Sequence, residues 1–244
     1  ARHSPMMERP TGSDSEAAEL APPWEFRGTD LGRILALSDG VFGFALTLLV
    51  LTVSLPSLTS SAARPPLLSE LASLETALLT YALGVVIIAG YWRTHVLVFT
   101  YLRRWDRTLI QANLLFLGMI ALQPFLITMI SEYSSSRAAV LLFCLVSIVT
   151  GLALAALWRY ASSQHRLVAA GLDSEHIRYV QVSTLLAPAV FAISAAVSFV
   201  NVSIAIYCWA GVFLVTFVAR RRAFAVRRPP AVLGEAAPAG APKG

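Results

Sequence analysis

Charged residues are scarce in this chain of 244 residues, at 14% of the total, against about 25% in a typical soluble domain. Hydrophobic residues make up 57%, and the mean hydropathy is +0.67. This balance excludes a soluble globular domain and a disordered chain. The two cysteines, Cys144 and Cys208, lie inside apolar runs and are too few for a disulfide scaffold. The class of protein that these exclusions leave is a polytopic membrane protein.

The chain also lacks the motifs of enzymes and of nucleic-acid binding. It has no arrangement of Ser, His and Asp typical of a catalytic triad and no His or Cys residues with the spacing of metal ligands. It also has no Gly-rich phosphate-binding loop. We therefore expect no enzymatic activity, no bound metal and no cofactor. The net charge is +5, but most basic residues are Arg at the ends of apolar runs, which is typical of loop charges that orient a membrane protein. No basic patch is interleaved with aromatics, so we expect no nucleic-acid partner.

Long apolar runs mark the membrane spans, each of which needs about 20 residues. Four of them lie at 33–55, 72–100, 108–130 and 138–158. A further stretch, 179–219, contains no charged residue, and as one helix it would be about twice as long as the hydrocarbon core is thick. A turn at 198–203 around Asn201 would divide it into two spans. The sequence thus predicts an all-α integral membrane protein with six transmembrane helices per subunit.

Both ends of the chain are polar. Residues 1–30 have no apolar signal-peptide core, and residues 221–244 are Arg-rich and then rich in Ala, Pro and Gly. We expect flexible cytoplasmic tails around a transmembrane domain at 31–220. Placing both tails, with Arg33 and Arg220 at the adjoining span ends, and the loops at 101–107 and 159–178 on one side gives that side 16 of the 19 basic residues. The positive-inside rule then predicts a multi-pass protein of the cell membrane with both termini in the cytoplasm.

Polar side chains inside the predicted spans are few. Each is a functional hypothesis, because burying it costs several kcal/mol unless it has a partner. These side chains are Asp39 in the first span, Arg93 and His95 in the second, and Asn113 and Gln123 in the third. The alternative is that they only hold the helices together through interhelical hydrogen bonds. Arg93 would then extend toward the interface, as Arg33 would at the start of the first span.

The first span separates into two faces at 100° per residue. An apolar ladder with i, i+4, i+7 spacing consists of Phe44, Leu48 and Leu51, with Gly40 and Leu55 extending it and Thr47 at its border. Ser38 and Asp39 fall on other faces, and we expect them to point into the protomer. Such a ladder is an ordinary packing stripe in most membrane proteins, so its periodicity alone assigns no function.

The same stretch resembles the signature of the transmembrane protein 175 family, the lysosomal-type potassium channels, in its six-helix prokaryotic branch. Arg33, Ser38 and Asp39 match the family's spacing of Arg, three residues, then Phe-Ser-Asp. Residues 47–51 match its Thr-Leu-Leu-Val-Leu run. Leu37 replaces the Phe of the family's triplet, which changes how the triplet packs.

The resemblance continues downstream and covers about residues 33–130. Trp92 and His95, followed by Phe99, look like the family's pattern on the second helix. The stretch 113–116, Asn-Leu-Leu-Phe, and the later Pro124 look like its pattern on the third helix. Three motifs in the right order on the right helices argue against chance agreement.

The resemblance implies a potassium-permeable channel assembled as a homotetramer, in which the first helix of each subunit lines a central pore. Phe44, Leu48 and Leu51 would form rings of a hydrophobic gate, with Thr47 beside them. Phe44 stands where the family usually has Ile or Leu, and four Phe rings would narrow the pore. Because ions would pass at least partly hydrated, selectivity for K⁺ over Na⁺ should be modest. The expected partners are K⁺ and other monovalent cations, the lipid bilayer and the other copies of the chain.

In this interpretation the signature residues are structural. We expect Ser38 and Asp39 to bond with side chains of the second and third helices and so to fix the rotation of the pore helix. The expected partners are Trp92, His95 and Asn113. A carboxylate paired with an imidazole would also respond to pH.

A secondary transporter of a small ion or solute is the main alternative. Such a protein needs a binding site near the membrane midplane on interrupted helices. Pro188 and Gly151 are the candidate interruptions here, and the two halves of the chain show no evident repeat.

Overall fold

Residues 29–53, 75–133, 135–169 and 171–209 are described by a computed structural model of the chain, and they are almost entirely helical. The long helices are α2 (Thr29–Leu48), α4 (Glu75–Thr100), α5 (Arg107–Glu132), α6 (Arg137–Ser162) and α7 (Ser174–Val197). Short 3₁₀ turns follow α2 and α6, namely η1 (Leu49–Thr52) and η2 (Ser163–His165). All five long helices belong to segments that are long and apolar enough to cross a membrane. The prediction of an all-helical membrane protein is confirmed.

Polar side chains cap the N-terminal ends of two of the helices. Asp106 caps α5, since its Oδ1 accepts a hydrogen bond from the backbone N–H of Leu109 at 2.8 Å. Ser136 caps α6 in the same way through Ala139 at 3.4 Å. Helix α2 begins at Thr29, earlier than the predicted start of the first span. Residues 1–28 and 221–244 of the two predicted tails lie outside the described residues.

The long uncharged stretch folds back where the sequence predicts a turn. Helix α7 ends at Val197, and the Oδ1 of Asn201 accepts a hydrogen bond from the N–H of Ile204 at 3.0 Å. This bond caps a helical segment over residues 202–209. Residues 210–219, the rest of the predicted sixth span, lie outside the described residues. The described part of the chain therefore has five candidate spans and a further helical segment at 202–209.

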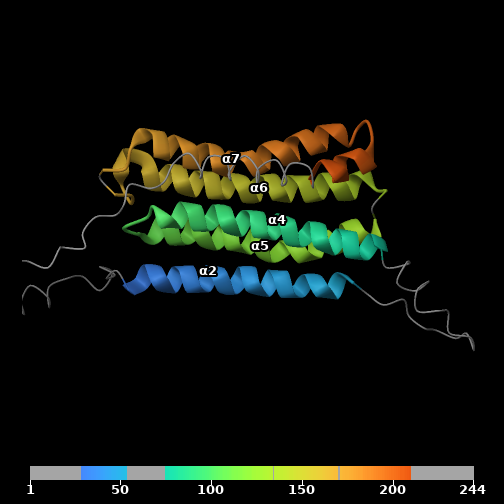
Figure 1. The fold of residues 1–244 in the computed structure, drawn as a ribbon, viewed down its shortest axis with the longest axis horizontal. Helices are drawn as coiled ribbons and strands as arrows, with labels where there is room; N and C mark the ends of the chain where they lie inside the picture. Colours follow the sequence, from blue (N-terminus) through green and yellow to red (C-terminus); the bar gives the residue numbers. More distant parts are fainter. Residues whose placement is uncertain (1–28, 54–74, 134, 170, 210–244) are drawn as a thin grey trace, which may run out of the picture.

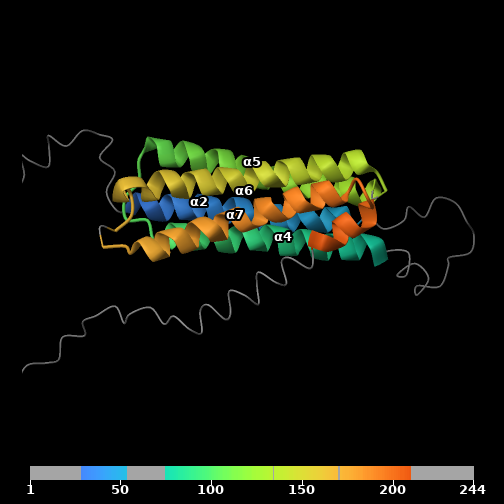
Figure 2. The ribbon, with the colours of Figure 1, turned by 90° about the horizontal axis from the view of Figure 1, so that it is seen from above.

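The helices form three layers (Figure 1). Helix α2 lies on one side of the bundle, α4 and α5 form the middle layer, and α6 and α7 cover the far side. Seen from above (Figure 2), α4 and α5 lie at opposite edges of the bundle. Helices α2 and α7 overlap in this view although they belong to opposite outer layers. Only 22% of the α2 span is buried, against 39–50% of the other four. Most residues of the α2 span therefore lie outside the buried core of the protomer.

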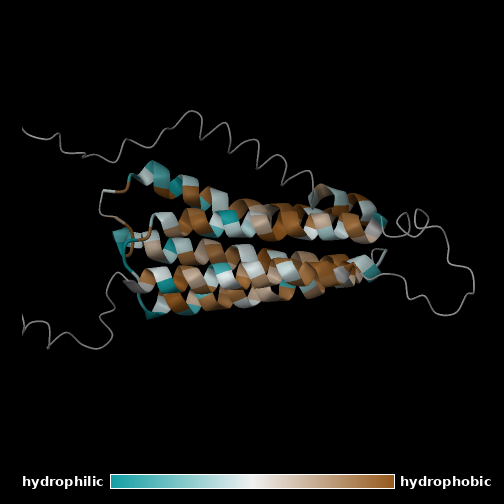
Figure 3. Ribbon diagram, turned by 60° about the horizontal axis from the view of Figure 1, so that its bottom comes forward, coloured by the Kyte–Doolittle hydropathy of each residue, from teal (hydrophilic) through white to brown (hydrophobic). Residues whose placement is uncertain are grey.

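The two ends of the bundle differ in polarity. Hydrophilic residues gather mainly at one end of the bundle, and hydrophobic residues predominate along the rest of the helices (Figure 3). The connection between α4 and α5 and the connection between α6 and α7 lie at the same end as the start of α2 (Figure 1). These are the two basic loops that the positive-inside rule places on one side of the membrane.

Helices α6 and α7 pack tightly against each other at Gly151 and Pro188. A Cβ atom on Gly151 would lie 2.5 Å from Cδ of Pro188, so only glycine permits this crossing. Both residues lie inside uninterrupted helices. Neither position therefore supplies the interrupted helix that a transporter site requires.

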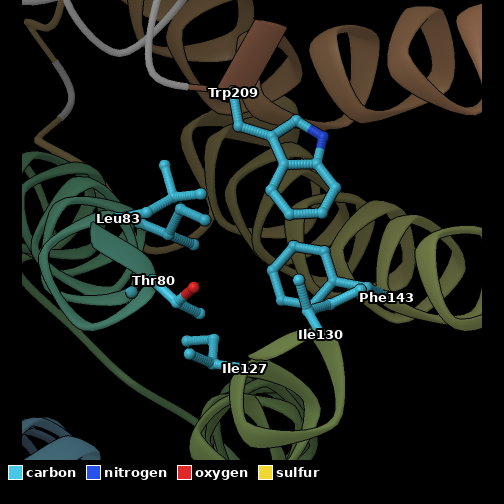
Figure 4. A pocket seen from close by; sticks show the side chains of 8 residues that line it. Thr80, Leu83, Ile127, Ile130, Phe143 and Trp209 are labelled. Carbon is cyan, nitrogen blue, oxygen red and sulfur yellow. The ribbon is translucent and has the colours of Figure 1, made fainter. Parts of the chain in front are cut away.

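A small apolar crevice lies where α4, α5, α6 and the segment 202–209 meet (Figure 4). The rings of Phe143 and Trp209 stack there at 4.5 Å between centroids. Leu83 of α4 and Ile127 and Ile130 of α5 face them. Nearly all of the lining is carbon, so the crevice belongs to helix packing and offers little to orient a polar ligand.

Candidate functional site: the exposed face of α2 and its anchor

Helix α2, together with the 3₁₀ turn η1 that continues it, buries one face in the protomer and exposes the other. The buried face is formed by Phe42, Ala45 and Leu49, each at most 1% exposed. On the opposite face Phe44 is 65% and Leu51 is 70% exposed. Thr47 is exposed beside them, and Leu48 is half-buried at the border. The predicted ladder thus lies mostly outside the core of its own subunit.

A directed chain of hydrogen bonds ties the buried face of α2 to α4 and α5. The hydroxyl of Ser38 donates to the carbonyl oxygen of Ile34 at 2.8 Å, so its oxygen is free to accept. It accepts from Nδ2 of Asn113 at 3.1 Å, which turns Oδ1 of Asn113 toward Nε2 of His95 at 3.0 Å. For that contact to be a hydrogen bond, Nε2 must carry the proton. Ser38, Asn113 and His95 are each at most 1% exposed.

Aromatic rings hold the imidazole of His95 in place. Phe99, one turn along α4, stacks on it at 4.2 Å between centroids. Phe116 of α5 lies nearly parallel to it at 5.5 Å, and Phe42 of α2 approaches at 5.7 Å. One ring from each of three helices therefore contacts the imidazole, which locks its orientation toward Asn113.

Asp39 makes a separate contact at the surface of the protomer. The indole Nε1–H of Trp92 donates to Oδ1 of Asp39 at 2.9 Å, joining α4 to α2. Asp39 is exposed and Trp92 is 41% exposed. The expectation that Asp39 points into the protomer is therefore wrong. The carboxylate bonds Trp92 and the imidazole bonds Asn113, so the predicted carboxylate–imidazole pair is not what the structure contains.

The remaining polar residues of the spans have different surroundings. Arg33 is exposed in the second turn of α2, and Arg93 is exposed on α4. Gln123 is fully buried in α5, and neither atom of its amide has a hydrogen-bond partner within the described part of the chain. Within the part of the chain that the structure describes, no group of three His, Cys, Asp or Glu side chains could hold a metal ion.

One interhelical contact was missed by the sequence analysis. The hydroxyl of Tyr91 donates to the carbonyl oxygen of Ser147 at 2.7 Å and joins α4 to α6. A tyrosine in the middle of an apolar span needs a partner for its hydroxyl. That rule would have marked Tyr91 as an interhelical contact, although it would not have identified the partner.

The chain is similar in sequence to known potassium channels. Residues 33–124 match the family model described as "Endosomal/lysosomal potassium channel TMEM175". A potassium channel of Streptomyces collinus is 29% identical over 174 residues, which are 70% of this chain and 83% of that protein. A potassium channel of Chamaesiphon minutus is 28% identical over 177 residues, which are 71% of this chain and 87% of that protein.

Solved structures share the fold. The crystal structure of a lysosomal potassium-selective channel TMEM175 homolog from Chamaesiphon minutus aligns with a TM-score of 0.67 at 24% identity, over 79% of this chain and 98% of that one. A variant of the potassium channel MtTMEM175 aligns with a TM-score of 0.51 at 20% identity, over 83% and 99% of the two chains. The matched segment 33–124 contains the three motifs that carry the predicted resemblance, so over this part of its length the chain is similar to the TMEM175 potassium channels.

Proposed function

We propose that four copies of this chain form a potassium-permeable cation channel whose central pore is lined by α2. The observation that carries the proposal is the exposed face of α2, where large apolar side chains lie outward while the opposite face is anchored to α4 and α5. A single protomer cannot enclose a path for ions. Cyclic symmetry would convert each exposed residue into a ring around a common axis.

The rings of Phe44 and Leu51 would be hydrophobic constrictions. A bare cation cannot cross such a ring cheaply, because removing its water costs tens of kcal/mol. The pore therefore conducts only when it is wide enough for partly hydrated ions, and dewetting closes it when it narrows. Selectivity for K⁺ over Na⁺ is accordingly modest in this mechanism.

Thr47 places an oxygen on the same exposed face. Its hydroxyl donates to the carbonyl oxygen of Phe44 at 2.8 Å, so the hydrogen points back to the helix and the lone pairs remain for a cation. Four such oxygens would form a polar ring between the two constrictions. There the hydroxyl oxygens would coordinate a permeating ion in place of some of the water that it has lost.

The anchor sets which face of α2 meets the pore. A helix that rotates by one residue turns by 100°, which would replace Phe44 by a neighbour at the constriction. Ser38 and Asp39 face two different helices through Asn113 and Trp92, and together they oppose such a rotation. In this role they are positioning residues and do not contact the ion.

We propose that the channel lies in the cell membrane with both termini in the cytoplasm. The two basic loops lie at the end of the bundle where α2 begins, and the excess of arginine assigns that end to the cytoplasm. A C-terminus on the same side requires an even number of spans, and residues 210–219 of the predicted sixth span lie outside the described residues.

Ion flux in liposomes tests the proposal. Purified protein is reconstituted, and K⁺, Cs⁺ and Na⁺ gradients are applied in turn, with protein-free liposomes as the control. We expect rapid K⁺ and Cs⁺ flux, weaker Na⁺ flux, and single-channel currents beyond the turnover of a transporter. Native mass spectrometry should give the mass of four chains. No flux, or slow saturable exchange, would contradict the channel.

A further inference from the structure

A cluster of exposed arginines lies at the end of the bundle where α2 begins. Arg103 and Arg104 lie between α4 and α5, Arg107 is the first residue of α5, and Arg166 lies between α6 and α7. We call these four residues the arginine platform. Within the described residues, the structure pairs none of the four guanidinium groups with a carboxylate. At the opposite end the described part of the chain has one arginine, Arg137, whose Nε donates to the carbonyl oxygen of Ser198.

The two loops that carry the platform are bonded to each other. Leu102 and Val168 form an antiparallel bridge. The backbone N–H groups of Arg103 and Arg104 both donate to the carbonyl oxygen of Leu167, at 2.9 and 3.2 Å. These bonds use main-chain atoms, so the arginine side chains are not needed to hold the loops together. They are free to serve another purpose.

The acidic residue closest in sequence to the platform is already engaged. Oδ1 of Asp106 caps α5 through the N–H of Leu109, and Oδ2 accepts from the hydroxyl of Tyr160 at 2.6 Å. The guanidinium carbon of Arg166 lies 4.9 Å from the centre of the Tyr160 ring, which restrains this side chain by a cation–π contact. The arginine platform therefore keeps its positive charge, and the two loops that carry it are held together by main-chain hydrogen bonds.

The position of the platform indicates what it binds. Half-buried aromatic residues lie at the same helix ends, namely Tyr101, Trp105 and Tyr160, as in the aromatic belts that mark the membrane interface. Arginines at that level meet the phosphate groups of lipids, and a guanidinium fork binds phosphate through paired hydrogen bonds. The cytoplasmic leaflet carries anionic lipids that attract such clusters.

We propose that the arginine platform binds the phosphate group of anionic phospholipids in the cytoplasmic leaflet. Phosphatidylglycerol is the simplest such lipid. Free phosphate has the same chemistry, but the aromatic belt favours a headgroup held at the interface. The inference uses the membrane orientation given under the proposed function and does not depend on ion conduction.

Native mass spectrometry of the full chain in detergent tests this inference. The protein is offered equal amounts of phosphatidylglycerol and phosphatidylcholine with the same acyl chains. We expect the wild-type protein to retain mainly phosphatidylglycerol. The variant R103Q/R104Q/R107Q/R166Q should lose this preference, by about fivefold per arginine if each contributes as surface arginines usually do. The matched control R103K/R104K/R107K/R166K keeps the charge and should retain most of the preference.

Several outcomes would overturn the proposal. They are a wild-type protein without preference, a Gln variant that keeps it, and a Lys variant that loses it as fully as the Gln variant. A further arm adds inorganic phosphate in millimolar excess, and displacement of the lipid by it would overturn the choice of a headgroup. Gel filtration checks folding, and the single variant R107Q, expected to lower the preference by about fivefold, decides the matter if the quadruple variant aggregates. Because no arm measures flux, failure here is distinct from failure of the channel proposal.

Discussion

Trp92 of α4 and Asp39 of α2 lie 53 positions apart in the chain and are joined by a hydrogen bond of 2.9 Å between Nε1 and Oδ1. The bond lies at the edge of the exposed face of α2, whereas the contacts of Ser38 lie in the core. The two bonds hold α2 from different sides. A helix held at only one of them would be freer to turn about its axis.

A double-mutant cycle on this pair measures its contribution. Trp92→Phe removes the donor, and Asp39→Asn keeps an acceptor but removes the charge. We expect each variant to lower both the thermal unfolding midpoint in detergent and the K⁺ flux. The double variant should cost less than the sum of the two, by about 1 kcal/mol. Additive effects, or an Asp39→Asn variant with unchanged assembly and flux, would remove Asp39 from the positioning role.

The buried pair of His95 and Asn113 gives a second prediction. Asn113→Leu leaves the Nε2–H of His95 without its partner, and His95→Phe leaves Oδ1 of Asn113 without its own. Each should lower the free energy of unfolding by about 1–3 kcal/mol, because an unpaired buried polar group keeps its full desolvation cost. The double variant H95F/N113L should be more stable than the sum predicts, since it leaves neither group behind. Denaturant titration in mixed micelles measures this, and a double variant as costly as the sum would contradict the bond.

The gate is tested by shortening its largest side chain. Phe44→Ala should raise the leak of K⁺ and Na⁺ into liposomes severalfold, because a wider apolar ring is easier to wet. Phe125→Ala is the matched control, since Phe125 on α5 is 64% exposed and Phe44 is 65% exposed. The control should leave the flux unchanged. Unchanged flux in Phe44→Ala, or an equal rise in both variants, would place the constriction elsewhere.

The crossing of α6 and α7 makes a prediction about stability alone. Gly151→Ala brings a methyl group to 2.5 Å from Cδ of Pro188, and the forced shift should destabilise the bundle by about 1–3 kcal/mol. Gly118→Ala is the control, because nothing lies within 4 Å of its added Cβ. This control should be neutral or stabilising by about 0.5–1 kcal/mol, as alanine is the better helix former. Thermal unfolding compares the two, and equal midpoints would argue against a tight crossing.

The candidate site could be predicted only in part. The sequence pattern selects Ser38, Asn113 and His95, because a polar residue in a span must find a partner. It also selects Gln123, whose amide has no partner in the described part of the structure. A list of polar residues cannot distinguish these cases, because each bond depends on the rotation and depth of two helices at once. The same limit explains the wrong expectation for Asp39.

The sequence by itself determined the helical membrane fold, the positions of the described spans, the turn at Asn201 and the similarity to the TMEM175 channels. Apolar length, loop charge and helix capping act within one segment, so they can be read without knowledge of neighbouring helices. Only the tertiary structure decided which face of α2 is left exposed, which polar groups pair, and that the two basic loops are bonded together. In a membrane both core and lipid are apolar, so a stripe such as Phe44 and Leu51 looks the same in sequence whether it is buried or exposed.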